Sequence, residues 1–336
     1  MTQFMHSRLA RVLWISAAFY AGACLAQPSF AAQGDAATDY PSKPIRFIVP
    51  FVPGGGTDTA ARVIGKKLTD AWGQQVVVDN RPGAAGAIAL ATTAAAIPDG
   101  YTICVISASQ TVNSATNPQL TYDLEKDLQG ITQAVSLFYV LSVGNSVPAT
   151  SVKELIAYAK ANPGKLNFGS SGTRGLQHFA GEMFNHLAGV KLTHVPFKGG
   201  AALVVAMAAG EIQVGFLALV NVRPHVARGR VRVLAITAKQ RAPVLPDVPT
   251  IAEAGVPGYE IDQWHGVVTG AKVPRAVVRK LSKAIGEAIR SPEAVQRLSA
   301  DGSTPVGSSP EQFAAHIKSE IAKWRMLVKD AGLALH

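Results

Sequence analysis

The sequence predicts an α/β protein built from two domains. Apolar strand-like runs alternate along the chain with segments whose apolar residues recur at helical spacing, which is typical of α/β folds. The length of 336 residues exceeds what one hydrophobic core usually organises. An apolar share of 48% against a charged share of 16% indicates large buried cores and excludes a disordered chain.

Residues 1–32 have the layout of a secretory signal peptide. Arg8 and Arg11 precede an apolar run over residues 12–26, and small residues allow cleavage after Ala26, Ala31 or Ala32. This run is too short to span a membrane comfortably, and no later segment reaches the roughly 20 apolar residues that a transmembrane helix needs. We therefore expect a soluble exported protein.

The two cysteines bear on processing and on redox state. A lipoprotein alternative would use Cys24, but residues 21–23 lack the large aliphatic residue expected before an acylated cysteine. Removal of the signal peptide leaves Cys104 alone, so no internal disulfide can form. Because Cys104 lies in the apolar run 103–106, we expect it to be a small buried hydrophobe.

The formal net charge of +10 limits the kinds of ligand and partner that we expect. A positive protein favours anionic small molecules or an anionic surface. The basic residues are scattered and no aromatic-basic motif appears, so we expect no nucleic-acid partner.

In the first half, residues 45–50, 76–78 and 101–107 are predicted strands. Ala60, Ile64 and Leu68 mark one face of the first helix, and an Ala-rich helix follows the turn at 81–86 and stops near Pro98. A strand at 138–143 leads into a new unit.

In the second half, Ser151 and Glu154 form a capping-box pattern that opens a helix closed at 162–164. A strand at 166–168 precedes a helix whose apolar face is predicted to be Leu176, Phe179, Met183 and Leu187. A strand, a Gly-Gly turn and a helix occupy residues 193–209, and strands follow at 214–219 and 231–237. Two C-terminal helices are marked by Val277, Leu281, Ile285 and Ile289, and by Phe313, Ile317, Ile321 and Trp324.

Two glycine-rich turns are the main candidates for a binding site. Pro50 and Phe51 precede Gly54, Gly55 and Gly56 in the first half, and Pro196 and Phe197 precede Gly199 and Gly200 in the second. Each motif is predicted to be a strand, a turn and a helix start, where glycine lets a ligand approach backbone N–H donors that have no intrahelical partner. Two such turns can hold an anion between them. The alternatives are a tight turn alone and, for Asp58, a helix cap rather than a cleft wall; the motif lacks the spacing of nucleotide loops.

Two further motifs favour other chemistries only weakly. Residues 169–173 contain Ser171 between two glycines but miss the nucleophile-elbow spacing of hydrolases. His178, Glu182 and His186 recur every four residues, a spacing that suits a metal, although no further ligands are evident and a surface stripe is the simpler interpretation. We expect no metal and no cofactor.

Four blocks of the sequence resemble one protein family. Residues 40–51, which continue into 53–58, resemble the opening of the mature solute-binding receptors of tripartite tricarboxylate transporters, the Bug-type family. Residues 78–84, 162–172 and 245–255 are similar to its other blocks, and the likeness runs from about Tyr40 to the C-terminus.

The resemblance implies export to the periplasm of a Gram-negative-type cell envelope. It also implies a periplasmic-binding-protein (Venus flytrap) fold in which each domain is a β-sheet flanked by helices. Domain 1 would comprise residues 40–137 plus 266–336, and domain 2 residues 138–265. Such receptors hold a carboxylate mainly through main-chain N–H groups and hydroxyls, and they close on the ligand. The candidate ligand-binding residues are Pro53, Gly54, Gly55, Gly56, Thr57, Asp58, Ser107, Ser109, Ser170, Ser171, Gly172, Thr173, Lys198, Gly199, Gly200, Leu217, Ala218 and Trp264.

The sequence departs from the family pattern where specificity would be set. Leu217 and Ala218 stand where many relatives have an acidic or polar pair, so a ligand ammonium would lose a partner. His265 follows Trp264 where another aromatic residue is usual, and the turn at 269–274 also differs. The role of Trp264 has two open interpretations: a core residue near the hinge, or an aromatic wall of the cleft.

The predicted function is that of a monomeric receptor, not an enzyme, which captures a small organic anion and presents it to membrane transporter subunits. A ligand sensor for a membrane signalling kinase is the nearest alternative. An exported hydrolase that uses Ser171 or the His178 face is the alternative from a different class. The sequence does not identify the ligand.

Overall fold

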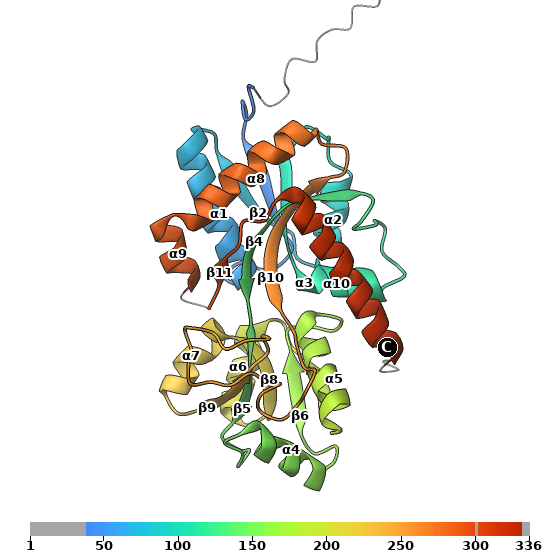
Figure 1. The fold of residues 1–336 in the computed structure, drawn as a ribbon, viewed down its shortest axis with the longest axis vertical. Helices are drawn as coiled ribbons and strands as arrows, with labels where there is room; N and C mark the ends of the chain where they lie inside the picture. Colours follow the sequence, from blue (N-terminus) through green and yellow to red (C-terminus); the bar gives the residue numbers. More distant parts are fainter. Residues whose placement is uncertain (1–37, 300–301, 331–336) are drawn as a thin grey trace, which may run out of the picture.

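The computed structural model describes residues 38–299 and 302–330, and the predicted signal peptide lies outside the described residues. Two lobes are stacked along the long axis of the molecule (Figure 1). Each lobe contains one β-sheet with helices on both faces. We call the lobe with the six-stranded sheet the first lobe and the lobe with the five-stranded sheet the second lobe.

The first-lobe sheet has the strand order β11-β4-β10-β3-β1-β2. β1 pairs in parallel with both β2 and β3, whereas β10 runs antiparallel to β3 and β4. Its strands are β1 (Ile45–Val49), β2 (Val76–Asn80), β3 (Thr102–Ser107), β4 (Leu128–Leu137), β10 (Gln263–Gly270) and β11 (Thr304–Pro305).

Helices cover both faces of this sheet because β1 and β3 are apolar on both sides. Phe47 and Val49 pack on one face with Ile64 and Leu281, while Ile48 belongs to the core on the other face. The first-lobe helices are α1 (Gly56–Trp72), the 3₁₀ turn η1 (Ala84–Gly86), α2 (Ala87–Ala94), α3 (Ala108–Thr116), α8 (Arg275–Arg290), α9 (Pro292–Ser299) and α10 (Pro310–Asp330).

The second-lobe sheet has the order β7-β6-β8-β5-β9, in which β6 is parallel to β7 and β8 and β5 is antiparallel to β8 and β9. Its strands are β5 (Tyr139–Gly144), β6 (Asn167–Ser170), β7 (Thr193–Pro196), β8 (Val214–Ala218) and β9 (Val231–Ile236). Its helices are α4 (Val152–Ala161), α5 (Leu176–Ala188), α6 (Gly200–Ala209) and α7 (Leu219–Ala227).

The chain passes between the lobes twice. β4 ends at Leu137 and β5 begins at Tyr139, so one residue separates the two sheets at this crossing. The chain leaves β9 at Ile236 and returns to the first lobe through β10, whose first residue, Gln263, pairs with Leu137. Trp264 and His265 therefore lie in the first-lobe sheet, a few residues before the domain boundary expected at 265/266.

The predicted helix faces are largely confirmed. Ala60, Ile64 and Leu68 are buried, as are the apolar residues that marked both C-terminal helices. The prediction that Leu187 belongs to the buried face was wrong, because Leu187 is 38% exposed at the end of α5. The Ser151 hydroxyl accepts a hydrogen bond from the Glu154 N–H, as expected. The second bond of a capping box would run from the Ser151 N–H to the Glu154 carboxylate, but this carboxylate accepts from the Thr150 N–H instead.

Candidate functional site

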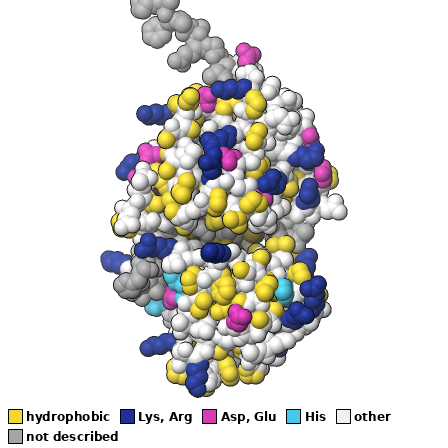
Figure 2. All heavy atoms as spheres, turned by 180° about the vertical axis from the view of Figure 1, so that it is seen from behind, with side chains coloured by type: hydrophobic (Ala, Val, Ile, Leu, Met, Phe, Trp, Pro, Cys, Tyr) yellow, Lys and Arg dark blue, Asp and Glu magenta, His cyan; other side chains and the backbone are white. Residues whose placement is uncertain are grey.

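Strands from both sheets direct their carboxyl ends toward the space between the lobes. β4 leaves the first lobe at its carboxyl end. β3 runs in the same direction as β4, because both strands are antiparallel to β10, and β1 is parallel to β3. β5 enters the second lobe at its amino end, and β8 runs opposite to it, so that Ala218 at the end of β8 pairs with Tyr139 at the start of β5. Open α/β sheets bind ligands at such edges. Figure 2 shows that the surface is hollowed between the lobes.

The 53–58 turn joins β1 to α1 at this edge. Gly55 is the N-cap, without a side-chain cap, and Thr59 is the first residue whose N–H bonds back into the helix, to Gly55. The amides of residues 56–58 thus have no intrahelical acceptor. No atom lies within 4 Å of the position that a Cβ would take on Gly54 or Gly55, so the turn is open on this side.

Asp58 closes the turn from inside the helix. Its Oδ2 accepts the Gly54 N–H at 3.0 Å and the Arg62 Nε–H at 2.9 Å, and its Oδ1 accepts from Asn80 at 2.9 Å. Burial disfavours its charge, but the bonds from Arg62, Gly54 and Asn80 outweigh this and hold the pKa of Asp58 below its ordinary value. Asp58 lies one turn into α1 and reaches back to the residue before the N-cap, which agrees with the capping interpretation.

Thr57 and His265 meet at the same edge. The Thr57 hydroxyl lies 3.3 Å from Nε2 of His265, and both residues are buried. His265 pairs across the sheet with Ser107 at the end of β3. Burial lowers the pKa of His265 to about 4, so its ring is neutral at physiological pH.

Ser107 begins α3 and is held by a residue that the sequence analysis missed. The Gln110 side chain accepts the Ser107 N–H at 2.7 Å and donates to the Ala85 carbonyl at 3.1 Å. Ser107 followed three residues later by Gln110 is a capping-box spacing, so a signal for this helix start was present. Ala84 and Ala85 have φ angles of 48° and 52°, a strained conformation for residues with a side chain.

The 170–174 turn joins β6 to α5 in the second lobe. The Ser171 N–H donates to the Gln177 side chain at 2.7 Å, a contact that no sequence motif indicated. Ser171 and Thr173 are exposed, and the Ser171 hydroxyl has no hydrogen-bond partner among the described residues. The φ of Gly172 is 140° and that of Arg174 is 60°, so this turn also contains strained backbone.

Ser170, buried at the end of β6, has partners that the sequence analysis also missed. Its hydroxyl donates to the Gly172 carbonyl at 2.8 Å and lies 2.7 Å from Nε2 of His194. The His194 ring stacks on His178 with centroids 3.8 Å apart. Burial, and then the neighbouring His178, lower the pKa of His194 to about 4.

One hydrogen bond links the helix starts of the two lobes. The Leu176 N–H at the start of α5 donates to the Ser109 hydroxyl in the first turn of α3 at 3.3 Å. This bond places the Ser109 side chain where the two lobes meet. The candidate residues of β3–α3 and β6–α5 are thereby brought together.

The 197–200 turn lies beside the 170–174 turn, because the Phe197 N–H donates to the Ser170 carbonyl at 2.8 Å. Lys198 is exposed and makes no ion pair with a described residue. Gly200 starts α6, and a Cβ there would lie 3.4 Å from the Asn221 side chain of α7. Lys198 is thus a cation at the second-lobe edge.

Two of the remaining candidates are core residues in this structure. Leu217 is fully buried on the sheet face that α6 and α7 cover. Trp264 is fully buried and packs edge-on against Phe313 of α10, which favours its interpretation as a core residue. Ala218 is partly exposed, at the end of β8.

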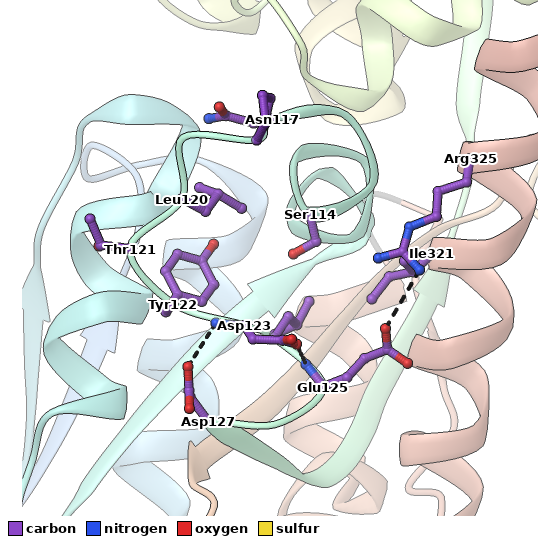
Figure 3. A pocket seen from close by; sticks show the side chains of 12 residues that line it. Ser114, Asn117, Leu120, Thr121, Tyr122, Asp123, Glu125, Asp127, Ile321 and Arg325 are labelled. Atoms are coloured by element: carbon purple, nitrogen blue, oxygen red, sulfur yellow. Dashed lines mark hydrogen bonds and ion pairs between the residues drawn. The ribbon is translucent and has the colours of Figure 1, made fainter.

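A separate pocket of about 430 Å³ opens on the first lobe (Figure 3). The loop between α3 and β4 and the outer end of α10 line it, and Arg325 there lies 3.9 Å from Glu125. None of the candidate ligand-binding residues lines this pocket. Its rim is acidic, with Asp123, Glu125 and Asp127, so it does not suit an anion.

The remaining polar candidates do not form a metal site. His178 contacts His194 of β7, whereas His186 is exposed at the end of α5. Over the described parts of the chain, no three His, Cys, Asp or Glu side chains are grouped closely enough to hold a metal ion. Cys104 is buried as expected, and burial raises the pKa of its thiol to about 12.

The fold and the facing helix starts define a class of protein: a two-lobed α/β binding protein of the periplasmic-binding-protein type. Residues 60–333 match the model of the tripartite tricarboxylate transporter family receptor. The chain belongs to this family of solute-binding receptors. None of the helices between residues 38 and 330 that the structure describes is both long and apolar enough to cross a membrane.

Relatives agree in sequence and in structure. The chain is 37% identical to an uncharacterised protein encoded between tcbD and tcbE in a Pseudomonas species, with 92% of both chains covered. It is 33% identical to the protein BugT of Bordetella pertussis, over 97% of this chain and 99% of BugT. A structure of an R. palustris protein with adipate is 35% identical and has a TM-score of 0.82, with 88% of this chain and 99% of that chain covered. MatC of Rhodopseudomonas palustris with bound malate is 30% identical with a TM-score of 0.79, over 86% of this chain and all of MatC.

Proposed function

We propose that this protein is an exported receptor that captures a small organic carboxylate between its lobes and delivers it to a tripartite tricarboxylate-type membrane transporter. The observation that carries the proposal is that the starts of α1, α3, α5 and α6 follow strand ends that face each other across the lobes. Helix starts offer unpaired N–H donors and a positive dipole end, which suit an anion.

The proposed binding residues are those predicted from the sequence at the strand ends, but the structure separates them by exposure and two further residues join them. Ser171, Thr173 and Lys198 present side chains at the surface, whereas Leu217 and Trp264 act through packing. Gln110 and Gln177 join the set because they hold the turns in place. The protein's two proposed domains, residues 40–137 plus 266–336 and 138–265, would close on the ligand by virtue of its contacts with both.

The class of ligand follows from the charges at the site. The Asp58 carboxylate already accepts hydrogen bonds from Gly54, Arg62 and Asn80. Ala218 has no carboxylate, so the ammonium group of a ligand would find no free acidic partner at either position. Two related structures contain adipate and malate, which supports a carboxylate. We therefore expect a plain carboxylate to bind more tightly than an amino acid of similar size.

The hydrolase alternative was expected to use Ser171 or the His178 face. The serine and histidine that contact each other at this turn are instead Ser170 and His194, with the Ser170 hydroxyl 2.7 Å from Nε2 of His194. A nucleophile must reach its substrate, and the Ser170 side chain is fully buried and donates its proton to the Gly172 carbonyl. The pair is thus better suited to holding the turn than to attacking a substrate.

Native mass spectrometry of the purified protein, followed by calorimetry with adipate, malate and glutamate, tests the proposal. We expect one bound anion per chain, and adipate or malate to bind more tightly than glutamate. Tighter binding of glutamate, or turnover of a panel of esters, would contradict it. Uptake of the identified anion by cells that lack this protein separates transport from signalling: uptake should fall if the receptor serves a transporter.

A further inference from the structure

Two stacked histidines lie directly behind the 170–174 turn. His178 comes from the first turns of α5 and His194 from β7, and these elements flank β6, which ends at Ser170. The ring planes are 13° from parallel, and the Phe168 ring lies 5.0 Å from that of His194. His178 is 9% exposed. The pair is therefore a packed feature of the site and not a surface stripe.

The hydrogen bonds fix where His194 carries its proton. The Ser170 hydroxyl has one proton and gives it to the Gly172 carbonyl, 2.8 Å away. His194 Nε2, 2.7 Å from the same oxygen, must then be the donor. His194 thus holds Ser170, and Ser170 holds Gly172, in the neutral state of the ring. A second proton on His194 would leave this bond intact.

His178 has the opposite arrangement. Its Nδ1 accepts the N–H of Arg174 at 3.3 Å, so the proton of the neutral ring sits on Nε2, which faces the Glu182 carboxylate at 3.7 Å. A proton added to Nδ1 would replace the acceptor by a donor pointing at the Arg174 N–H. Arg174 is the strained residue that ends the turn, with a φ of 60°. Protonation of His178 therefore removes a contact that holds this conformation.

We propose that His178 is a positioning residue that holds the 170–174 turn in its ligand-binding shape only while its Nδ1 is unprotonated, so that acid solution weakens ligand binding. The proposal rests on the proposed function, because it assumes that this turn contacts the anion.

The groups around His178 define how the pair responds to acid. Glu182 lies on the same helix, His194 comes from β7 and Arg174 from the turn, while β6 contributes the uncharged Phe168 and Ser170. Burial, and then the neighbouring His178, lower the pKa of His194 to about 4, so His194 stays neutral above this pH. One proton on His178 is thus enough to release the turn.

Three variants test the proposal with adipate and malate as probes, by calorimetry from about pH 8 to about pH 5. His178→Asn keeps an acceptor near the position of Nδ1 but cannot titrate, and His178→Phe keeps a ring without an acceptor. His186→Ala is the matched control, since His186 is exposed on the same helix. We expect the wild type and His186→Ala to lose affinity about fivefold or more toward acid. His178→Phe should be weak at every pH. His178→Asn should recover most of the loss and fall less toward acid than the wild type, with a remaining slope that comes from protonation of the ligand carboxylates.

Amide hydrogen exchange without ligand gives a second, independent readout. Protection of the Arg174 N–H should fall toward acid in the wild type, after correction for intrinsic exchange, and be low throughout in His178→Phe. A pH profile of affinity in His178→Asn that parallels the wild type, or unchanged Arg174 protection in His178→Phe, would overturn the inference. If neither probe binds the wild type at any pH, the proposed function fails for these anions, and the exchange result still decides the role of His178.

Discussion

The 53–58 turn of the first lobe and the 170–174 turn of the second lobe occupy equivalent places but are held by different chemistry. Each follows a strand whose carboxyl end faces the other lobe, and each opens a helix. A charged group, Asp58, binds the first turn to Arg62 and Asn80. The side chains of Gln177, Ser170 and His178 hold the second turn through single hydrogen bonds.

Because their contacts differ, we expect the two turns to respond to different perturbations. The pKa of Asp58 is lowered by its donors, so its contribution to stability is present above the ordinary carboxyl pKa and is lost as pH falls through the folded value. The second turn depends instead on the contact from the Arg174 N–H to Nδ1 of His178, which a proton on that nitrogen would remove. We expect the first turn to remain formed under mild acid conditions in which the second loosens.

The largest effect is expected from Gly55→Val in the first turn. Gly55 has a φ of −83° and open space around its Cβ position, so valine should fold without strain while its side chain blocks the anion. Affinity for the carboxylate should fall about 100-fold or more, which corresponds to roughly 3 kcal/mol, with little change in the melting temperature.

The control for this variant lies at the other end of α1. Gly73 also has open space but a φ of 66°, so Gly73→Val should lower the melting temperature and leave affinity unchanged. Wild-type affinity in Gly55→Val would mean that the site has been placed wrongly.

An intermediate effect is expected from Asp58→Asn, measured by urea unfolding. The loss of a buried charged acceptor should cost about 2 kcal/mol at neutral pH. Because Asp58 contributes only while ionised, the difference from wild type should shrink at a pH below the folded pKa. Asp70→Asn removes an exposed i,i+4 pair with Lys66 on the same helix and should cost no more than about 0.5 kcal/mol. An equal loss for Asp58→Asn in acid would show that packing, not charge, is responsible.

The smallest effect on the stability of the empty protein is expected from Ser171→Ala in the second turn. The Ser171 hydroxyl is exposed and has no hydrogen-bond partner in the described structure, so its removal should not alter the stability of the empty protein. A lost hydrogen bond to a charged acceptor is worth about 1.5–3 kcal/mol, which predicts a tenfold or greater weakening of binding. Calorimetry that finds unchanged affinity would restrict the second lobe's contribution to its main-chain N–H groups.

Sequence patterns predicted the parts of the site that depend on local backbone geometry. Gly54, Gly55 and Ser171 were recognisable because glycine-rich turns before apolar helical faces have few alternative uses. The sequence analysis missed β4 and α3, whose mixed polar and apolar residues give no clean period, although Ser107 and Gln110 held a capping signal. His194 was missed because a single histidine in a short strand carries no pattern.

By itself the sequence determined the two α/β units, the buried faces of α1, α8 and α10, and the glycine turns, since these follow from periodicity and from the freedom of residues without a Cβ. Which residues meet across these units depends on the tertiary structure. Ser109 reaches Leu176 and Thr57 reaches His265 because strand order brings distant segments to one edge. Leu217 turned into the core because the alternation of β8 points it at α6 and α7. Such contacts depend on sheet order and register, which local sequence does not encode.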